Sequence, residues 1–178
     1  SKNTIKYNYL ILADAVVTKE PALSTRFRNI IFDYCFKSLD DSIMKQAAII
    51  GSKLLKKNQD EIDSRYNNLM NSMEINSIDD AYVFAASFAC ILNAKGLASF
   101  NQRDVFTKTD AWGASENGLY RILVCFIFEY LSVLYKTLLE LSLPKILPTL
   151  LKLFGDPKSS VRQASDSACQ SIISNLTH

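Results

Sequence analysis

The stretch LPKILPTLLKLFGDPKSSVRQASDSACQSIISNL, residues 143–176, decides the fold of this chain. Its apolar residues recur every three or four positions in two runs, which is the spacing of one face of an α-helix. The first run comprises Leu143, Ile146, Leu147, Leu150, Leu151 and Phe154, and the second Val161, Ala164, Ala168, Cys169, Ile172, Ile173 and Leu176. Between the runs, Gly155 is suited to end a helix with positive φ, and Asp156 and Pro157 are suited to begin one. The stretch therefore predicts two antiparallel helices joined by a tight turn.

The same unit recurs along the chain. Met44, Val83, Tyr120 and Val161 lie near the start of successive second helices, at intervals of 39, 37 and 41 residues. A period near 40 with two helices per repeat is typical of HEAT and armadillo arrays, because stacked hairpins bury an apolar face that no hairpin buries alone. We expect an all-α fold, a right-handed HEAT/ARM-type α-solenoid of about four antiparallel helical hairpins. Because the sequence begins with Ser1 rather than Met, we expect it to be a piece of a longer array.

This period divides the chain into five parts. Residues 1–20 are expected to be a partial preceding repeat, 21–58 and 59–97 one repeat each, 98–137 an irregular repeat with a loop at 108–115, and 138–178 the last repeat. The repeat signature of the last part consists of Pro148, Gly155, Asp156, Val161, Arg162 and Ala164. In the first full repeat, Phe27, Ile30, Ile31, Tyr34 and Cys35 are predicted to face inward.

Composition narrows the class of protein further. Hydrophobic residues make up 48% of the chain, which is too many for a disordered segment, and 5 glycines and 4 prolines are too few for the turns of an all-β protein. The net charge of +2 gives no overall attraction to nucleic acid or to an anionic membrane, so such binding requires a local patch. The longest apolar run, residues 119–135, is shorter than the roughly 20 residues that cross a bilayer, and no signal peptide is visible.

The four cysteines and the single histidine indicate no metal or redox site. Cys35, Cys90, Cys125 and Cys169 are far apart in apolar helical contexts, which predicts buried free thiols and a reducing compartment, the cytoplasm or the nucleus. His178 stands alone at the last position. The carboxylate pairs at residues 40–41, 60–61 and 79–80 all lie where a helix begins, which favours capping over catalysis. We expect no cofactor, no metal, no small-molecule substrate and no enzymatic activity.

A few basic and aromatic residues are candidates for contact with a partner. Lys53, Lys56 and Lys57 end a helix, where they either balance the helix dipole or bind phosphates or an acidic protein. Lys45, Arg121 and Arg162 follow the repeat positions and either bond neighbouring turns and capping aspartates or contact a ligand. Trp112 either anchors a partner or fills a gap between repeats. The full set of contact candidates is Lys45, Lys53, Lys56, Lys57, Trp112, Lys152, Lys158 and Arg162.

Residues 139–176 also resemble a known family. The steps Leu139-Glu140, Ile146-Leu147-Pro148, Phe154-Gly155-Asp156, Val161-Arg162 and Ser174-Asn175-Leu176 are similar to one HEAT repeat of the general-control translational activator, in the part of that family that is similar to fungal elongation factor three. Gly118, Phe128-Glu129 and Leu131 extend the likeness upstream, and it covers about residues 81–177. The chain departs from the family at Glu116 and Asn117, where basic residues are usual.

The resemblance implies a scaffold on the translating ribosome. Proteins of that family associate with ribosomes and with an ABC-type ATPase partner, and they activate the initiation-factor kinase under amino-acid starvation. The kinase-binding part of the family lies further towards the C-terminus than the part matched here. Alternative interpretations are a HEAT-repeat adaptor of another kind, such as a nuclear transport receptor or a phosphatase scaffold, and the HEAT domain of elongation factor three. An enzyme is a third alternative, which the absence of a nucleophile–base pair and of a phosphate loop disfavours.

Overall fold

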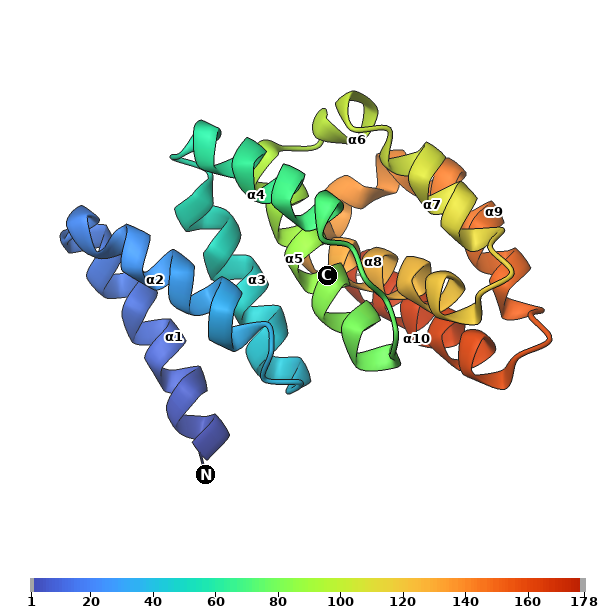
Figure 1. Cartoon of the computed structure of the whole chain (residues 1–178), viewed down its shortest axis with the longest axis horizontal. Helices are drawn as coiled ribbons and strands as arrows, with labels where there is room; N and C mark the ends of the chain where they lie inside the picture. Colours follow the sequence, from blue (N-terminus) through green and yellow to red (C-terminus); the bar gives the residue numbers. More distant parts are fainter. Residues whose placement is uncertain (1, 177–178) are drawn as a thin grey trace.

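The computed structural model describes residues 2–176, and these are 83% helical with no strand among them (Figure 1). The helices are α1 (Lys2–Lys19), η1 (Pro21–Leu23), α2 (Ser24–Ile30), η2 (Ile31–Cys35), α3 (Asp41–Leu55), α4 (Gln59–Asn71), α5 (Ile78–Lys95), α6 (Ser99–Gln102), α7 (Val105–Gly113), α8 (Gly118–Tyr135), η3 (Lys136–Ser142), α9 (Leu143–Phe154) and α10 (Ser159–Leu176). The predicted all-α class is confirmed, and the fold is compatible with an α-solenoid.

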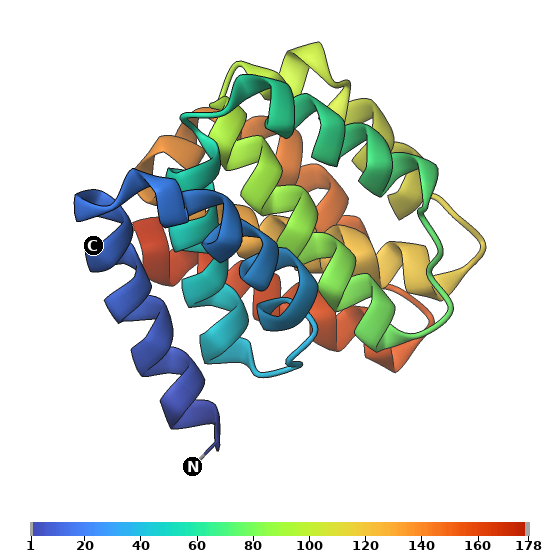
Figure 2. The ribbon, with the colours of Figure 1, turned by 60° about the vertical axis from the view of Figure 1, so that its left-hand side comes forward.

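The helices form two layers that follow the order of the chain. In one layer α1, α3, α5, α8 and α10 pack side by side, each on the next (Figures 1 and 2). In the other layer α2 with η2 packs on α3, α4 on α5, α7 on α8 and α9 on α10. Most of these contacts join elements that follow one another closely along the chain, as expected for stacked hairpins, and α3 also contacts α8.

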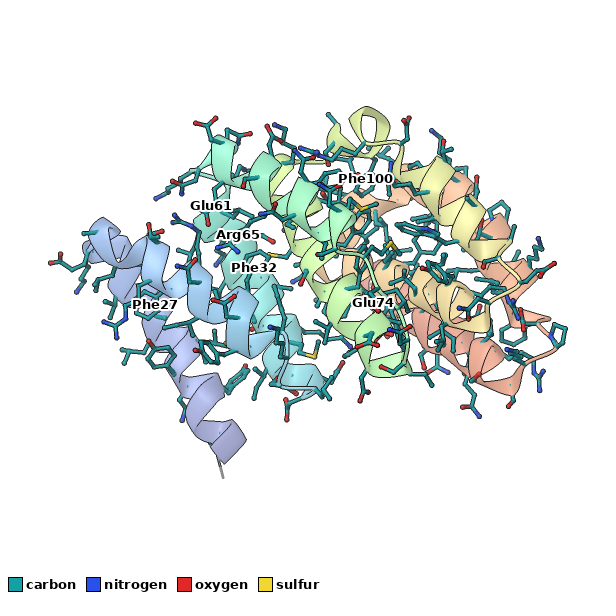
Figure 3. The ribbon with its side chains drawn as sticks, viewed as in Figure 1. Phe27, Phe32, Glu61, Arg65, Glu74 and Phe100 are labelled. Atoms are coloured by element: carbon teal, nitrogen blue, oxygen red, sulfur yellow. The ribbon has the colours of Figure 1, made fainter. Side chains whose placement is uncertain are left out.

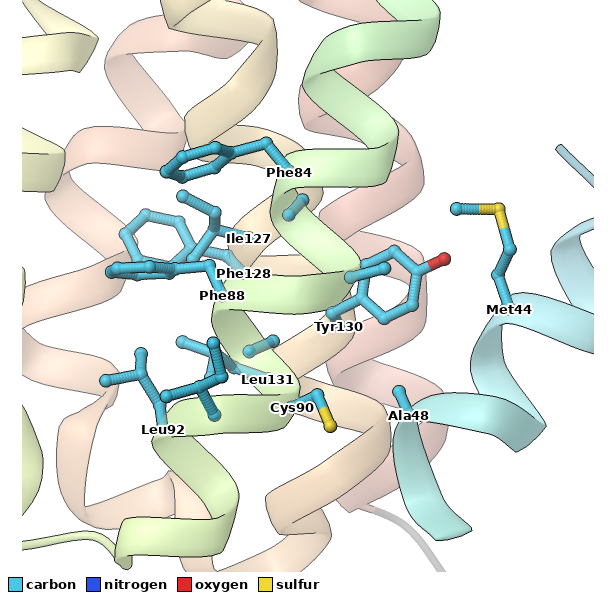
Figure 4. Close-up of a cluster of buried hydrophobic side chains, with 14 of the residues drawn as sticks. Met44, Ala48, Phe84, Phe88, Cys90, Leu92, Ile127, Phe128, Tyr130 and Leu131 are labelled. Carbon is cyan, nitrogen blue, oxygen red and sulfur yellow. The ribbon is translucent and has the colours of Figure 1, made fainter. Parts of the chain in front are cut away.

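The core lies along the interface of α3, α5 and α8 (Figure 4). Helices α5 and α8 are apolar nearly all round because neighbours cover them on several sides. Phe88 and Cys90 of α5 and Phe128 and Tyr130 of α8 are completely buried. Gly51 of α3 permits the close approach of α5, since a Cβ atom there would lie 3.0 Å from the Cys90 Sγ.

Polar side chains begin the helices much as the sequence indicates. The Asp40 carboxylate accepts a hydrogen bond of 3.0 Å from the Ile43 N–H and caps α3, which confirms its predicted role. Helix α5 begins earlier than expected, because Ser77 is its cap and residues 79–80 lie in its first turn. Asn117 caps α8 through the Leu119 N–H at 3.0 Å.

Three local predictions are wrong. The loop expected at residues 108–115 is helical as far as Gly113, because α7 turns Val105, Thr109 and Gly113 inward, one helical turn apart. Gly155 has φ −91°, so the α9–α10 turn needs no left-handed residue. Tyr34 is exposed and Phe36 is buried instead, since η2 is a π-helical turn whose extra residue shifts the inward face.

The apolar stripes of the last two helices are only partly buried. Ile146, Leu150 and Leu153 of α9 and Val161, Ala168 and Ile172 of α10 lie in the core. Leu147, Leu151, Phe154 and Ile173, which the periodicity also assigns to the inward face, are exposed. The neighbouring helices therefore cover only part of the apolar face of this helix pair.

Candidate interaction surface

The turn between α9 and α10 is organised by the carboxylate of Asp156, which is only 7% exposed. Its Oδ1 accepts a hydrogen bond from the Lys158 N–H at 2.9 Å. The Arg121 guanidinium reaches it from α8, with Nε 2.7 Å from Oδ2 and Nη2 3.2 Å from Oδ1. The hydrogen bonds from Arg121 hold the pKa of the Asp156 carboxyl below its usual value. Asp156 thus ties the start of α10 to the neighbouring α8.

Arg121 and Arg162 repeat one arrangement on successive helices. The Arg121 Nη1 donates to the carbonyls of Ser115 and Glu116 at 2.6 and 3.0 Å, in the turn before α8. The Arg162 Nη1 donates to the carbonyls of Asp156 and Pro157 at 2.6 and 2.9 Å, in the turn before α10. The prediction that these arginines bond neighbouring turns is confirmed for both, and the predicted bond to an aspartate side chain is confirmed for Arg121.

Two lysines lie beside this turn. Lys152 and Lys158 are exposed, and the Lys158 side chain crosses Gly118, where a Cβ atom would lie 2.8 Å from its Cδ. A hollow of about 390 Å³ between the α7–α8 and α9–α10 turns is lined by Ser115, Arg121, Lys152 and Asp156, among others. We call the exposed cations Lys152, Lys158 and Arg162 the basic turn surface. Arg121 already pairs with Asp156, and the exposed carboxylates on the elements of these three cations and on the neighbouring hairpin are Asp110 of α7, Glu116 of the α7–α8 turn and Asp166 of α10.

Lys45 is engaged by carboxylates instead of a turn. Its Nζ lies 2.8 Å from the Glu129 Oε1 on α8 and 3.1 Å from the Asp41 Oδ1 in its own helix, and the Tyr82 hydroxyl donates to the same Asp41 oxygen. Burial alone lowers the pKa of Lys45, but the bonds to Glu129 and Asp41 outweigh it and leave the pKa above its ordinary value. This lysine joins α3 to α8 and is less available to a ligand than an exposed cation.

A groove lies beside Lys45, between α1 and α3. It encloses about 640 Å³ and is lined by Thr4, Tyr7, Asp40, Ser42, Ile43, Lys45, Gln46 and Ile49. The lining combines apolar side chains with hydrogen-bonding groups, which suits a peptide segment better than a phosphate. No feature of the sequence pointed to this groove, because its two walls come from helices whose pairing only the fold reveals.

The remaining lysine candidates lie elsewhere. Lys53, Lys56 and Lys57 are exposed at the C-terminal end of α3, where cations favour the helix dipole. Figure 1 places this end of α3 on the opposite side of the molecule from the α9–α10 turn. The exposed basic candidates therefore fall into two separate groups instead of one patch, and Lys45 and Trp112 belong to neither group.

Trp112 does not form an exposed anchor. It is half-buried on α7, with its ring 6.1 Å from the Phe84 ring and 6.0 Å from the Phe88 ring, both in edge-to-face contact. The packing interpretation is confirmed, since the ring closes the space between α5 and α7, and its candidacy as a partner contact stays a prediction.

Cation–aromatic contacts connect the outer helices, which sequence reasoning missed. The Arg65 guanidinium lies 4.1 Å from the centre of the Phe32 ring, and Glu61 holds both Arg65 and the buried Arg28 (Figure 3). Similar cation–aromatic contacts recur further along the outer layer. The Arg103 guanidinium lies 4.0 Å from the centre of the Tyr66 ring, and the Lys145 Nζ lies 5.1 Å from the centre of the Phe106 ring. The sequence does contain a signal for these contacts, because the cation follows its aromatic partner by 33, 37 and 39 positions in the three pairs, which is near the repeat period.

In the part of the chain that the structure describes, the thiols and carboxylates form no cluster that could hold a metal ion. Within residues 2–176 no group of three or more His, Cys, Asp or Glu side chains is placed to hold a metal ion. The Cys35, Cys90 and Cys125 side chains are buried as predicted, and that of Cys169 is half-buried. Burial raises the pKa of Cys90 and of Cys125 to about 12. His178 lies outside the described residues.

One helical stretch, Gly118–Phe154, is long and apolar enough to cross a membrane by length and composition alone. Its most apolar window is 67% buried inside the fold, and the core helix of a soluble protein passes the same test. This stretch is therefore weak evidence for a membrane span.

Comparison of the chain with protein-family models, curated proteins and solved structures gives no match.

Proposed function

We propose that the chain is a HEAT-type α-solenoid of about four antiparallel hairpins and that it acts as a non-enzymatic binding scaffold. The sequential packing of helices in two layers supports this proposal. The recurring contacts support it too, because Arg121 and Arg162 bond their turns alike and three cations cover aromatic rings at near-repeat spacing. Such an array offers long surfaces to partners and needs no reactive group.

We further propose that this scaffold belongs to a cytoplasmic, ribosome-associated regulator of translation that activates the initiation-factor kinase under amino-acid starvation. The observation that carries the proposal is the basic turn surface of Lys152, Lys158 and Arg162, which falls inside the stretch that resembles the translational activator family. Exposed cations on a rigid turn suit the phosphate backbone of ribosomal RNA. The partners are the ribosome and, from the resemblance, an ABC-type ATPase, with no membrane and no small-molecule substrate.

Co-sedimentation with purified ribosomes tests this proposal. The 178-residue chain should pellet with ribosomes at about 50 mM salt and dissociate as salt rises towards about 200 mM, since phosphate contacts release counterions. A Lys152→Glu/Lys158→Glu variant should lose most of this binding. The matched control is Lys19→Glu/Lys37→Glu, which makes the same charge change at exposed lysines far from the turn. Failure of the unmodified chain to pellet at either salt concentration, or equal loss in both variants, would contradict the proposal.

A second candidate function is favoured by the groove between α1 and α3. Its mixed lining suits a protein ligand, as expected for an adaptor such as a nuclear transport receptor or a phosphatase scaffold. In that case substitutions in the groove, such as Gln46→Arg/Ile49→Arg, should abolish binding of an affinity-purified protein partner. Ribosome co-sedimentation should then be absent or unaffected by Lys152→Glu/Lys158→Glu.

A further inference from the structure

The edge of the stack formed by α9 and α10 exposes a continuous apolar stripe. Leu147, Leu151 and Phe154 are 39%, 68% and 53% exposed, and their spacing of four and three residues puts them on one line along α9. Ile173 of α10 is exposed as well. Three large apolar side chains in one line form a patch of the kind that marks an interface, unlike the scattered apolar residues of an ordinary surface.

This stripe lies on the side of α9 that faces away from α7. The opposite side carries Thr149, whose hydroxyl donates to the Asp110 carboxylate of α7 at 3.0 Å, and Lys145, which covers the Phe106 ring. At about 100° per residue, Leu147 and Leu151 point roughly half a turn away from Thr149 and Lys145. The stripe is thus where an outer helix following α9 in the stack would pack, as α9 itself packs on α7.

At the same edge, only one nitrogen of the Arg162 guanidinium donates hydrogen bonds to the described residues. Arg121 bonds its own turn with Nη1 and the Asp156 carboxylate of the following turn with Nε and Nη2. Arg162 bonds its own turn with Nη1 in the same way, yet among the described residues its Nε and Nη2 meet no acceptor. These two atoms are the fork of a guanidinium that binds a carboxylate in two parallel hydrogen bonds.

We propose that the α9–α10 edge binds one more helix–turn–helix unit of the same array, whose turn carries an acidic side chain that binds Nε and Nη2 of Arg162. An apolar helix of that unit covers Leu147, Leu151 and Phe154, and its carboxylate occupies the place that Asp156 has beside Arg121. This inference depends on the array architecture of the proposed function and not on ribosome binding, so each can fail without the other.

An extended chain tests the proposal with the protein's own hairpin as the probe. A copy of residues 136–176 is joined after Leu176, so that the second copy of Asp156 follows Arg162 as Asp156 follows Arg121. In the copy, Leu147→Gln, Leu151→Glu and Phe154→Gln make its own far edge polar. In the original part, Leu151→Cys reports on coverage through its rate of alkylation, with Lys37→Cys as an exposed control on a distant element.

The cysteine at position 151 should react at least about tenfold more slowly in the extended chain than in the original, while the one at position 37 reacts equally in both. Arg162→Gln, or Asp156→Asn in the copy alone, should return most of the reactivity at position 151. Both variants leave the Arg121–Asp156 pair of the original part intact.

Four outcomes would overturn the proposal. Equal labelling at position 151 in the two chains would show that the edge is not covered. Protection that neither Arg162→Gln nor the copied Asp156→Asn reduces would exclude the arginine–carboxylate contact. Labelling of the original chain that slows with concentration, alongside a dimer in sedimentation, would make a second copy the occupant. An added hairpin that contributes no helix to the circular dichroism spectrum counts against the proposal too, since such a unit folds only by stacking.

Discussion

The Arg121–Asp156 pair should contribute measurably to stability, and Asp156→Asn isolates that contribution. The substitution keeps the size of the side chain and removes its charge. Asp156 is 7% exposed and accepts two hydrogen bonds from Arg121 and one from the Lys158 N–H. Removing one partner of a buried pair costs about 3–5 kcal/mol, and Arg121 keeps its two carbonyl bonds, so we expect a loss of about 2–3 kcal/mol.

Urea unfolding followed by circular dichroism measures this loss at pH 7. In a chain of this size the loss corresponds to a fall in Tm of about 5–10 °C. The pKa of Asp156 is lowered in the folded state, so its contribution is complete above the unfolded pKa of about 3.9 and disappears as pH falls through the folded pKa. The difference between Asp156→Asn and the original chain should therefore shrink below about pH 4.

The control is Asp166→Asn, at an exposed aspartate of α10 that accepts a bond from Gln170. It should change stability by no more than about 0.5 kcal/mol. In a double-mutant cycle, Arg121→Gln and Asp156→Asn should show a coupling of about 1.5–3 kcal/mol. Additive losses, or a loss at pH 3 equal to that at pH 7, would refute the argument.

Three other perturbations test the packing and the buried groups. Gly51→Ala should lower the free energy of unfolding by about 1–2 kcal/mol in urea, because the added Cβ would lie 3.0 Å from the Cys90 Sγ. Gly118→Ala should change it by no more than about 1 kcal/mol, because the added Cβ meets only the flexible side chain of Lys158. Equal losses in the two variants would be inconsistent with this reasoning. Lys45→Met should lower the free energy of unfolding by about 2–3 kcal/mol at neutral pH, because it leaves Glu129, which is 9% exposed, without its cation. The control Lys56→Met, at an exposed lysine, should lower it by about 0.5 kcal/mol or less. Since the pKa of Lys45 is raised, its contribution is present below about pH 10.5 and is lost as pH rises through the folded pKa, so the same penalty at higher pH would count against the pair. At pH 8 iodoacetamide should leave Cys90 and Cys125, with pKa values of about 12, unmodified in the native protein and react slowly with half-buried Cys169; rapid native labelling of Cys90 in mass spectrometry would contradict their burial.

Much of the fold could be predicted because helices depend on local patterns. The periodicity of residues 143–176 gives two helices whose ends agree with α9 and α10, and the aspartate at position 40 caps α3 as its type suggests. The prediction failed where a local signal was weak or misleading. The glycine and tryptophan of residues 108–115 indicated a loop, yet Trp112 is held in a helix by the rings of Phe84 and Phe88, which are more than twenty residues away in sequence.

The candidate site was predictable in its residue types and not in its grouping. The equivalence of Arg121 and Arg162 followed from the repeat, and their bonds to the turns confirm it. The sequence grouped Lys45 with these two arginines. In the structure Lys45 pairs with Glu129, 84 residues away, because α3 contacts α8 as well as α5. Such a long-range pair leaves no signal in a single sequence.

The sequence by itself determined the helical class, the near-40-residue period and the apolar face of each helix, because all three follow from spacings within one or two turns of chain. Only the tertiary structure decided how much of each face is covered. On α9 the same apolar run contains buried Ile146 and Leu150 and exposed Leu147 and Leu151. Periodicity states which side of a helix avoids water, whereas burial depends on which neighbours reach that side. The difference between Arg121, whose fork holds Asp156, and Arg162, whose fork is open, has the same origin.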